Sequence, residues 1–288
     1  MVMSITMGEI AYTNAKPFFY YLDRQKLLQE GVQFEQDVPA SLNRKLEEQK
    51  LSGSAVSSFA FGSSIRALSL LPSVCVASVG KVRSILFYSR YPVDELSGRR
   101  IALTSTSATS VHLLKIILQE FYQVTEADYQ TQTPDPVKMK EQNDAYLLIG
   151  DDAIKASWEE SDWFQYDLGE LWYAHTGLPM VYAVFAVQND SFQQNESTWT
   201  VLYQNFLQSR QKAERDNFTG MAAEYSQQLG GSSAYWQEYF RGLHFTLGTK
   251  EQEGLLYYYH LAYKYGYLNE AVESLDILQP GDEVHYLF

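Results

Sequence analysis

The sequence predicts an α/β protein with two lobes, mixed sheets with flanking helices, and a helical C-terminal tail. Strand patterns alternate with helix patterns as far as Val187, which is typical of sheets joined by crossover helices. After Asn189 the pattern is helical throughout. The chain has 288 residues, of which 45% are hydrophobic and 20% charged, enough to bury the core of one large domain or two small ones.

The first part of the chain carries strand patterns separated by short helices. Strands are predicted at 5–10, 32–36 and 54–57, and one or two more within 74–89. Pro17 suits the first turn of a helix that runs through Leu22, because the first turn is the part of a helix that tolerates proline well. Further helices are predicted at 39–49 and 58–68.

A second alternating unit begins near Tyr91-Pro92 and leads into the helical tail. Its strands are predicted at 100–103, 145–149, 164–168 and 180–187. Its helices are predicted at about 107–121, from 150–152 onward and at 169–175. The tail is predicted as helices at roughly 197–229, 232–242 and 249–265, with the tyrosine-rich helix packed within the chain.

Two strands are candidates for the crossings between the lobes, at 82–89 and 180–187. They predict a first lobe of residues 1–87 plus 183–288 and an inserted second lobe of residues 88–182. Ligands of open α/β sheets bind outside the carboxyl ends of the strands. The segments expected to meet at one cleft are therefore 11–16, 57–63, 104–110, 150–152 and 176–179.

Several function classes are excluded by composition and by missing motifs. A net charge of −13 disfavours nucleic acid, and no apolar run approaches the ~20 residues of a membrane span. The N-terminus shows no basic segment followed by an apolar one, which predicts a cytoplasmic protein. No nucleotide-binding glycine motif, nucleophile elbow or histidine pair at ligand spacing is present, so we expect no cofactor and no metal. The single cysteine, Cys75, lies in an apolar strand and is expected to be buried and unreactive.

Small polar residues at strand ends remain as candidates for binding. Ser107, Thr109 and Ser110, with Thr106 before them, begin a helix whose free N–H groups suit a carboxylate, although an ordinary N-cap explains them equally well. Ser57-Ser58 form a second helix start with the same two readings. Gly150-Asp151 form a third, where capping by Asp151 is favoured over ligand binding, and Asn14 follows the first strand, where a structural turn asparagine is common. By these patterns alone, the chain is a cleft protein that binds a small anion.

An ordered set of short motifs adds a family resemblance that covers nearly the whole chain. The motifs are Ile10-Ala11-Tyr12-Thr13-Asn14-Ala15-Lys16-Pro17, Val56-Ser57-Ser58-Phe59-Ala60, Ser78-Val79-Gly80-Lys81-Val82-Arg83-Ser84-Ile85, Ala102-Leu103-Thr104, Ser107-Ala108-Thr109-Ser110, Leu147-Leu148-Ile149-Gly150-Asp151, Asp167-Leu168-Gly169 with Trp172, and Thr176-Gly177-Leu178-Pro179. In this order and spacing they resemble the chorismate dehydratase family of the futalosine route to menaquinone. The resemblance implies a fold like the type II periplasmic binding proteins. Thr13 departs from the family's usual leucine, a change expected to affect packing more than chemistry.

The resemblance also implies an activity and roles for particular residues. The implied activity is a hydro-lyase reaction, in which chorismate loses water to give 3-[(1-carboxyvinyl)oxy]benzoate. Asn14 and Ser84 are then the catalytic candidates, with the substrate's own enolpyruvyl carboxylate as base. The implied substrate-binding residues are Ser57, Ser58, Thr106, Ser107, Thr109, Ser110, Gly150, Asp151, Thr176 and Gly177. Two alternatives stay open: the 1,4-dihydroxy-6-naphthoate synthase of the same route, and a binding protein for a small anion without catalysis. Neither the oligomeric state nor the carboxylate that each loop holds follows from the sequence.

Overall fold

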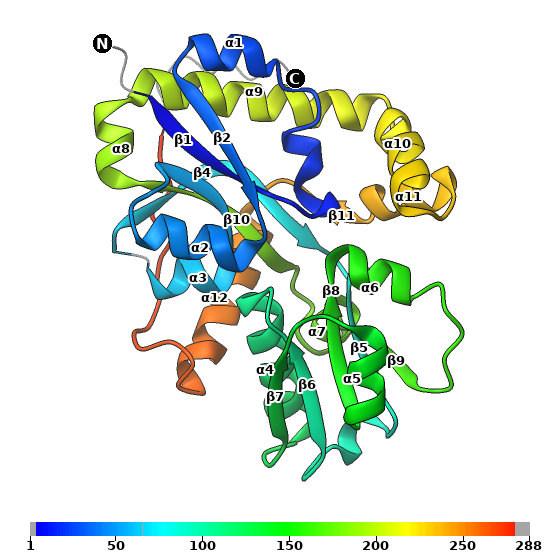
Figure 1. Cartoon of the computed structure of the whole chain (residues 1–288). Coiled ribbons are helices and arrows are strands. Elements are labelled where there is room, and N and C mark those ends of the chain that lie inside the picture. The colour runs from blue at the N-terminus through cyan, green and yellow to red at the C-terminus, as the bar shows by residue number, and fades with distance from the viewer. Residues whose placement is uncertain (1–3, 65, 280–288) are drawn as a thin grey trace.

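Two β-sheets, one above the other in Figure 1, form the frame of the protein in the computed structural model, which describes residues 4–64 and 66–279. Sheet A has the strand order β11-β4-β10-β3-β1-β2, and sheet B has the order β7-β6-β8-β5-β9. The strands of sheet A are β1 (Ile5–Ile10), β2 (Val32–Asp37), β3 (Gly53–Ser57), β4 (Leu68–Ser78), β10 (Met180–Gln188) and β11 (Leu243–His244). Those of sheet B are β5 (Ile85–Ser89), β6 (Arg100–Thr104), β7 (Asp128–Gln132), β8 (Ala145–Ile149) and β9 (Phe164–Asp167).

Both sheets are mixed, as predicted. In sheet A, β1 pairs in parallel with β2 and β3, whereas β10 runs antiparallel to β3 and β4. In sheet B, β6 pairs in parallel with β7 and β8, whereas β5 runs antiparallel to β8 and β9. Each sheet therefore has a parallel half that receives crossover helices and an antiparallel half close to the chain's passage between the sheets.

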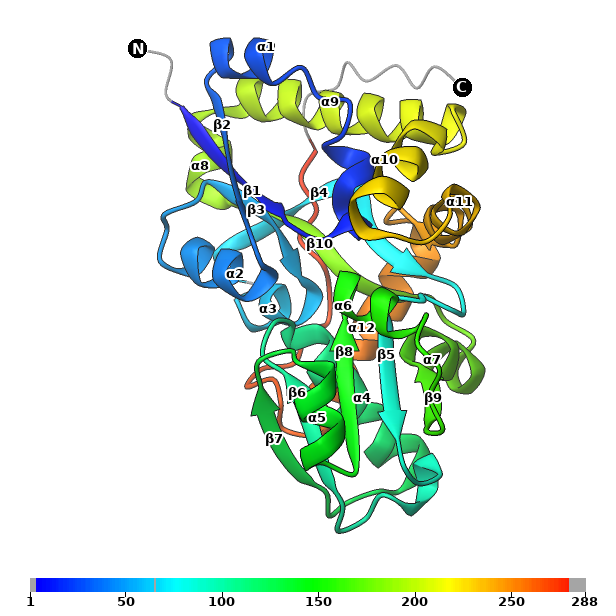
Figure 2. The ribbon, with the colours of Figure 1, turned by 45° about the vertical axis from the view of Figure 1, so that its right-hand side comes forward.

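Helices cover both sheets, and the last third of the chain is largely helical (Figures 1 and 2). The early helices are the 3-10 helix η1 (Thr13–Phe18), α1 (Arg24–Gln29), α2 (Pro39–Glu47) and α3 (Ser58–Ser63). The middle of the chain adds η2 (Val93–Glu95), α4 (Ala108–Tyr122), α5 (Pro136–Gln142), α6 (Gly150–Ala156) and α7 (Leu168–Thr176). The tail contains α8 (Asn189–Gln194), α9 (Glu196–Arg215), α10 (Thr219–Leu229), α11 (Ser233–Arg241) and α12 (Thr249–Lys264).

We infer that each sheet is the core of one lobe, and we call them the first lobe (sheet A) and the second lobe (sheet B). The chain passes to the second lobe through 79–84 and returns after α7. The strands predicted to cross do not do so, because β5 pairs only within sheet B and β10 only within sheet A. The predicted boundaries at 87/88 and 182/183 therefore fall inside these strands, and the division they describe stays a proposal.

Local chemistry explains where other elements depart from the prediction. The helix predicted from Pro17 to Leu22 is instead η1, a 3-10 helix with Pro17 inside it, because proline lacks the N–H that an α-helix interior needs. The predicted helix 197–229 is two helices, broken where Asn217 and Phe218 adopt positive φ angles of 55° and 57°. The helix predicted at 58–68 ends at Ser63, and β4 begins at Leu68. The sequence analysis did not predict α1, β7, α5 or β11, and it read the chain after Asn189 as helical without placing α8.

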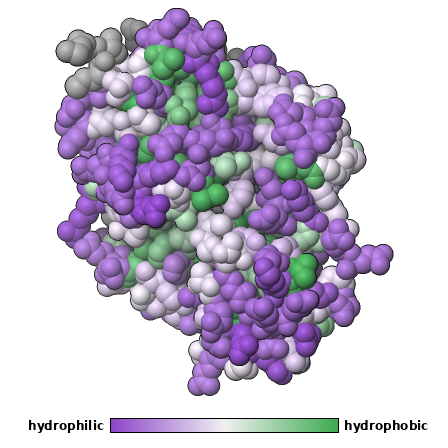
Figure 3. All heavy atoms as spheres, viewed as in Figure 1, coloured by the Kyte–Doolittle hydropathy of each residue, from purple (hydrophilic) through white to green (hydrophobic). Residues whose placement is uncertain are grey.

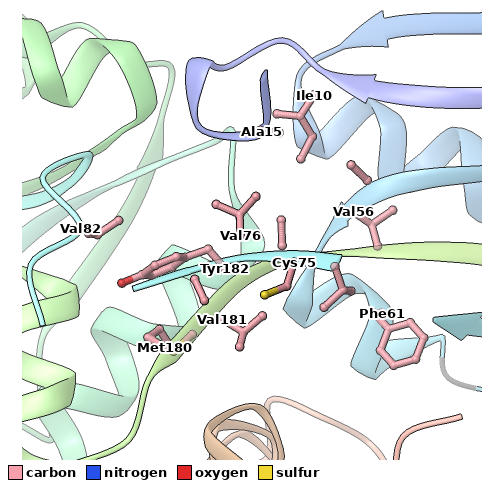
Figure 4. Close-up of a cluster of buried hydrophobic side chains, with 14 of the residues drawn as sticks. Ile10, Ala15, Val56, Phe61, Cys75, Val76, Val82, Met180, Val181 and Tyr182 are labelled. Carbon is pink, nitrogen blue, oxygen red and sulfur yellow. The ribbon is translucent and has the colours of Figure 1, made fainter. Parts of the chain in front are cut away.

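Figure 4 shows apolar side chains of β4 and β10 packed with residues from several other elements. Cys75 of β4 is fully buried there, and burial raises the pKa of its thiol, in line with the expected unreactive cysteine. Tyr182 of β10 extends from this cluster with its hydroxyl at the end near Val82 (Figure 4). The core thus reaches the segment that joins the two sheets.

Helix α12 ties the two lobes together at the back of the molecule. The hydroxyl of Tyr259 donates to the carbonyl of Ser58 on α3 at 2.7 Å, and that of Tyr258 donates to the carbonyl of Thr109 on α4 at 3.2 Å. The tyrosine-rich helix therefore packs within the chain, as predicted. Hydrophilic residues dominate the face seen in Figure 3. None of the helices in the described part of the chain is both long and apolar enough to span a membrane.

Candidate functional site: a small cavity between the two sheets

A small cavity lies where the ends of β1, β3 and β8 meet the start of α4 and the segment before β5. Its volume is about 30 Å³, room for only one or two water molecules. Its lining residues are Ile10, Tyr12, Asn14, Pro39, Ser57, Ser84, Ile85, Ser107, Ser110, Ile149, Gly150, Tyr182 and Ala183. Both sheets contribute to the walls, and the space between them is too small for an organic ligand unless the surrounding residues move apart.

Asn14 brings an amide with an unused acceptor into this cavity. The residue lies in η1, directly after β1, and its side chain lines the cavity. Its Oδ1 atom is buried and has no hydrogen-bond partner in the described structure. Since buried polar atoms are nearly always paired, an orphaned oxygen at a cavity wall indicates a group that pairs with a ligand.

Ser57 is held in place by its own helix and by a neighbour. It is the N-cap of α3, and its Oγ accepts from the backbone N–H of Ala60 at 3.3 Å. The side chain of Asn43 on α2 donates to the same oxygen at 3.2 Å and accepts from the Ser57 N–H at 3.3 Å. The hydroxyl is therefore fixed at the end of β3, with its own proton left for a further partner.

The N-terminus of α4 is the cavity's strongest source of positive potential. Ser107 caps this 15-residue helix by accepting from the N–H of Ser110 at 3.3 Å, and its Oγ donates to the Ser110 hydroxyl at 3.1 Å. Both residues are buried and line the cavity. A helix start with hydroxyl caps is suited to a carboxylate, because its dipole and free N–H groups favour negative charge.

Ser84 is positioned by hydrogen bonds of its neighbours in the connection between the sheets. The buried carboxylate of Asp167 accepts from the N–H groups of Val82 at 3.1 Å and Arg83 at 2.6 Å, and from two N–H groups at the start of α7. The carbonyl of Ser84 accepts from the N–H of Gly150 at 2.7 Å. The segment 82–84 is therefore anchored to both α6 and α7, which fixes the direction of the Ser84 side chain.

The cavity lining contains no lysine, arginine, histidine, aspartate or glutamate. Its titratable groups are the phenols of Tyr12 and Tyr182, and burial raises the pKa of both. These tyrosines therefore stay neutral donors at ordinary pH. The site can bind an anion through hydroxyls, an amide and backbone N–H groups, and it offers no side chain of ordinary basicity to remove a proton.

Among the contacts between the lobes, three lie at the two ends of α6. Thr13 in the first lobe donates its hydroxyl to Asp151 in the second at 2.7 Å. Gly150 has a positive φ of 60° and lies so close to Tyr12 that an added Cβ would be 2.7 Å from the ring. At the other end of α6, Trp158 packs against the turn before α11, where a Cβ on Gly231 would lie 2.8 Å from the indole.

Six of the ten predicted substrate-binding residues lie outside the cavity lining. The residues are Ser58, Thr106, Thr109, Asp151, Thr176 and Gly177. Ser58 donates to the carbonyl of Val181, and Thr109 accepts from the N–H of Phe59, so both hold the backbone near the site. Asp151 forms the contact between lobes described above.

The other three have separate reasons to be outside the lining, although Thr106 hydrogen-bonds to the lining residue Tyr12. The hydroxyls of Thr106 and Thr104 are 2.9 Å apart and hydrogen-bonded to each other. Thr176 and Gly177 end α7, where the Thr176 hydroxyl donates to the carbonyl of Trp172. The segment 176–179 follows a helix, not a strand, so the rule on strand carboxyl ends does not bring it to the cleft.

The structure adds lining residues that the sequence analysis did not select. Tyr12 belongs to the motif quoted for the first loop, but its ring was not assigned a role. Tyr182 lies in an apolar run whose pattern signals only a buried strand. The remaining additions are Ile10, Pro39, Ile85, Ile149 and Ala183. Within the described ranges, no group of three or more histidine, cysteine, aspartate or glutamate side chains is arranged to hold a metal ion.

Comparisons with known proteins give a family and a fold. A sequence profile of the family described as menaquinone biosynthesis matches residues 5–264. The chorismate dehydratase of Thermus thermophilus is 32% identical over 200 residues, which cover 64% of this chain and 70% of that protein.

Solved structures extend the likeness at the level of fold. A protein of Archaeoglobus fulgidus superposes with a TM-score of 0.65 at 17% identity, covering 92% of this chain and 98% of that one. The periplasmic aliphatic sulphonate binding protein of Escherichia coli superposes with a TM-score of 0.67 at 12% identity, covering 96% and 92%. The predicted fold, like that of periplasmic binding proteins, is confirmed.

Proposed function

The chain belongs to the menaquinone biosynthesis family, and from that premise we propose that it is a chorismate dehydratase acting in the futalosine route. The proposed reaction is the loss of water from chorismate, giving 3-[(1-carboxyvinyl)oxy]benzoate. The similarity to the curated Thermus thermophilus enzyme supports this proposal. So does the cavity, whose neutral donors suit a dicarboxylate and whose position between lobes suits a substrate that must be enclosed. A cytoplasmic location, expected from the sequence, remains part of the proposal.

The chemistry follows from what the substrate supplies and what the site lacks. The ether-bearing ring carbon adjoins a ring double bond that is conjugated with the ring carboxylate. Removal of its hydrogen therefore gives a delocalised carbanion. Loss of the neighbouring hydroxyl then makes the ring aromatic, which drives the reaction. The proton removed and the hydroxyl released together form the water, so no oxidant or reductant enters the balance.

The absence of a basic side chain from the cavity lining is the observation that carries this mechanism. A carboxylate of the substrate can then take the proton itself, provided that the enzyme holds it over the ring. We assign that task to Asn14, whose amide donates to the enolpyruvyl carboxylate while its orphaned Oδ1 pairs with a substrate hydroxyl. We assign the ring carboxylate, where negative charge grows, to the start of α4 at Ser107 and Ser110.

Lobe closure completes the site. With the lobes together, water is excluded and the fixed dipoles act in a low dielectric, where they stabilise the carbanion more strongly than they would in water. Ser84 contacts the leaving hydroxyl in this arrangement, and Ser57 contributes a donor from the first lobe. The division of these roles among the loops is the part of the proposal that mutagenesis must test.

The test is to incubate the purified chain with chorismate, without added metal or cofactor, and to follow products by chromatography and mass. Loss of the mass of one water, with a new benzoate-type absorbance, is the expected result. Asn14→Ala should lower turnover by about 100-fold, a typical loss for one oriented donor in a water-excluded site. Chorismate that is bound but returned unchanged would favour a binding protein. Chorismate that is ignored by a folded chain would refute the proposal.

A further inference from the structure

Ser84 has a buried hydroxyl whose surroundings leave one direction open. Its side chain is 1% exposed and lines the cavity. A hydroxyl carries one proton and can accept at two lone pairs. The carbonyl of Val82 lies at 3.5 Å from the Ser84 Oγ, too far for a strong bond. The Ser84 proton is therefore without a good acceptor among the described residues.

Tyr239 of α11 supplies the other half of the arrangement. Its hydroxyl donates to the Oγ of Ser84 at 3.1 Å, although the two residues are 155 positions apart in the sequence, and the Thr13 side chain also lies beside the phenol. The tyrosine is 1% exposed, and its ring is packed edge to face on Trp236 at 5.7 Å between centroids and against Phe240 at 5.3 Å. Burial, the largest influence, raises the pKa of Tyr239, so the phenol remains protonated at any ordinary pH.

A second contact joins the same two segments one residue earlier in each. Arg83 forms an ion pair with Glu238 at 2.6 Å, one residue before each member of the Ser84–Tyr239 pair. Helix α11 of the first lobe therefore docks along the segment that joins the two sheets. The ion pair is largely exposed and holds the helix only weakly, whereas the Ser84–Tyr239 bond is buried.

We propose that Tyr239 is a positioning residue that orients the Ser84 hydroxyl, so that the serine proton points into the cavity toward the leaving hydroxyl of the substrate. By donating to one lone pair, Tyr239 prevents Ser84 from turning its proton back toward α11. Donation also polarises the Ser84 O–H and strengthens the bond it gives to the substrate. This inference rests on the proposed function and assigns a part in it to the C-terminal helical tail.

The test is a double-mutant cycle of Tyr239→Phe and Ser84→Ala, read on chorismate turnover. Phenylalanine keeps the ring contacts, so Tyr239→Phe should lower kcat about 10- to 30-fold and leave KM within about twofold, because the lost orientation matters most as the hydroxyl leaves. In the Ser84→Ala background the same change should lower kcat less than about twofold, because no serine proton remains to be oriented.

A matched control lies in the same aromatic cluster. Tyr225 of α10 also packs against Trp236 and Phe240, with its ring tilted by 44° and 53°, is likewise buried, and makes no hydrogen bond through its hydroxyl within the described structure. Tyr225→Phe should therefore leave kcat unchanged. Equal losses in Tyr225→Phe and Tyr239→Phe would mean that the cluster only needs its packing, and would overturn the inference.

The remaining outcomes separate this inference from the proposed function. Equal loss from Tyr239→Phe in both backgrounds, or no loss in either, would overturn the role of Tyr239 while the dehydratase stands. A wild-type chain that binds chorismate without converting it would overturn the dehydratase and, with it, a role that depends on a leaving hydroxyl. A wild-type chain that neither binds nor converts chorismate overturns both.

Discussion

Gly150 tests whether closure of the lobes is needed for activity. The residue lies in the second lobe with a φ of 60°, and a Cβ added to it would come within 2.7 to 2.9 Å of three ring atoms of Tyr12 in the first lobe. Gly150→Ala therefore combines two penalties that act in different states. The left-handed backbone is strained in both the open and the closed form, whereas the contact with Tyr12 exists only when the lobes are together.

The two penalties have separate magnitudes and separate readouts. The left-handed conformation costs alanine about 1–2 kcal/mol relative to glycine, which for a chain of this size lowers Tm by about 2–8 °C. Overpacking of this kind costs about 1–3 kcal/mol. It therefore lowers the ratio of closed to open molecules about 5- to 150-fold, because each 1.4 kcal/mol is a factor of ten. Since the chain can relieve the clash by opening, we expect the clash to lower kcat/KM and to leave Tm unaffected.

Gly98 provides the matched control. It lies in the second lobe away from the cavity, has a φ of 73°, and an added Cβ would meet nothing within 4 Å. Gly98→Ala should match the Tm loss of Gly150→Ala and keep wild-type turnover of chorismate. Small-angle scattering of the two variants reports the degree of opening directly. Equal turnover in the two variants would refute the reasoning, because the contact between Gly150 and Tyr12 would then have no part in the working state.

Three further predictions concern pH, packing and salt. Burial raises the pKa of Asp151 above its ordinary value, so the native state holds this proton in a pH range where the unfolded state has lost it. The free energy of unfolding therefore falls as pH rises through the window just above the ordinary aspartate pKa. Asp151→Asn should make this fall shallower in thermal unfolding. Asp167, whose pKa is also raised, contributes a fall of the same sign in both proteins. A Cβ on Gly254 of α12 would lie 2.1 Å from the carbonyl oxygen of Pro179, so Gly254→Ala should destabilise the chain by about 3 kcal/mol. Gly220→Ala in α10, where the nearest atom is the terminal hydroxyl of Tyr21 at 3.3 Å, should be neutral or slightly stabilising in the same unfolding assay. Because the chain carries −13 and the cavity lining carries no cation, screening should aid a dianion, so kcat/KM for chorismate should rise modestly from low salt to an ionic strength of about 0.15 M; a fall would point to an attracting cation at the entrance.

The site was predictable from the sequence where residues follow a strand directly. Asn14, Ser57, Ser107, Ser110 and Gly150 all lie at or just beyond strand ends, and the structure gathers them around one cavity. The reason is geometric, because parallel strands of a sheet end at one edge and two such edges face each other here. Hydroxyl-rich turns at strand ends therefore predicted part of the cavity lining.

Contacts that depend on the meeting of distant segments were not predictable. The Tyr239 hydroxyl reaches Ser84 only because α11 folds back onto the segment that joins the two sheets. The tail contains many tyrosines that pack in the core, so the sequence does not distinguish Tyr239 from them. The bond from Thr13 to Asp151 likewise exists only between closed lobes. Thr13 was expected to matter for packing, and its hydroxyl instead links the two lobes.

The absence of cations from the cavity lining and the closure contacts of the lobes have one physical explanation. An open cleft in a chain of net charge −13 attracts a dianion weakly, because neutral donors compete with water on nearly equal terms. Once water is excluded, the same donors act in a low dielectric and their interaction with negative charge becomes much stronger. In the proposed dehydratase, closure is therefore the step that converts a weak site into a strong one. The contacts that close the lobes, at Gly150 and Asp151, adjoin the donors they strengthen. Stabilisation is then greatest where charge develops after closure, as catalysis by differential binding requires, and reopening returns the donors to water and releases the product.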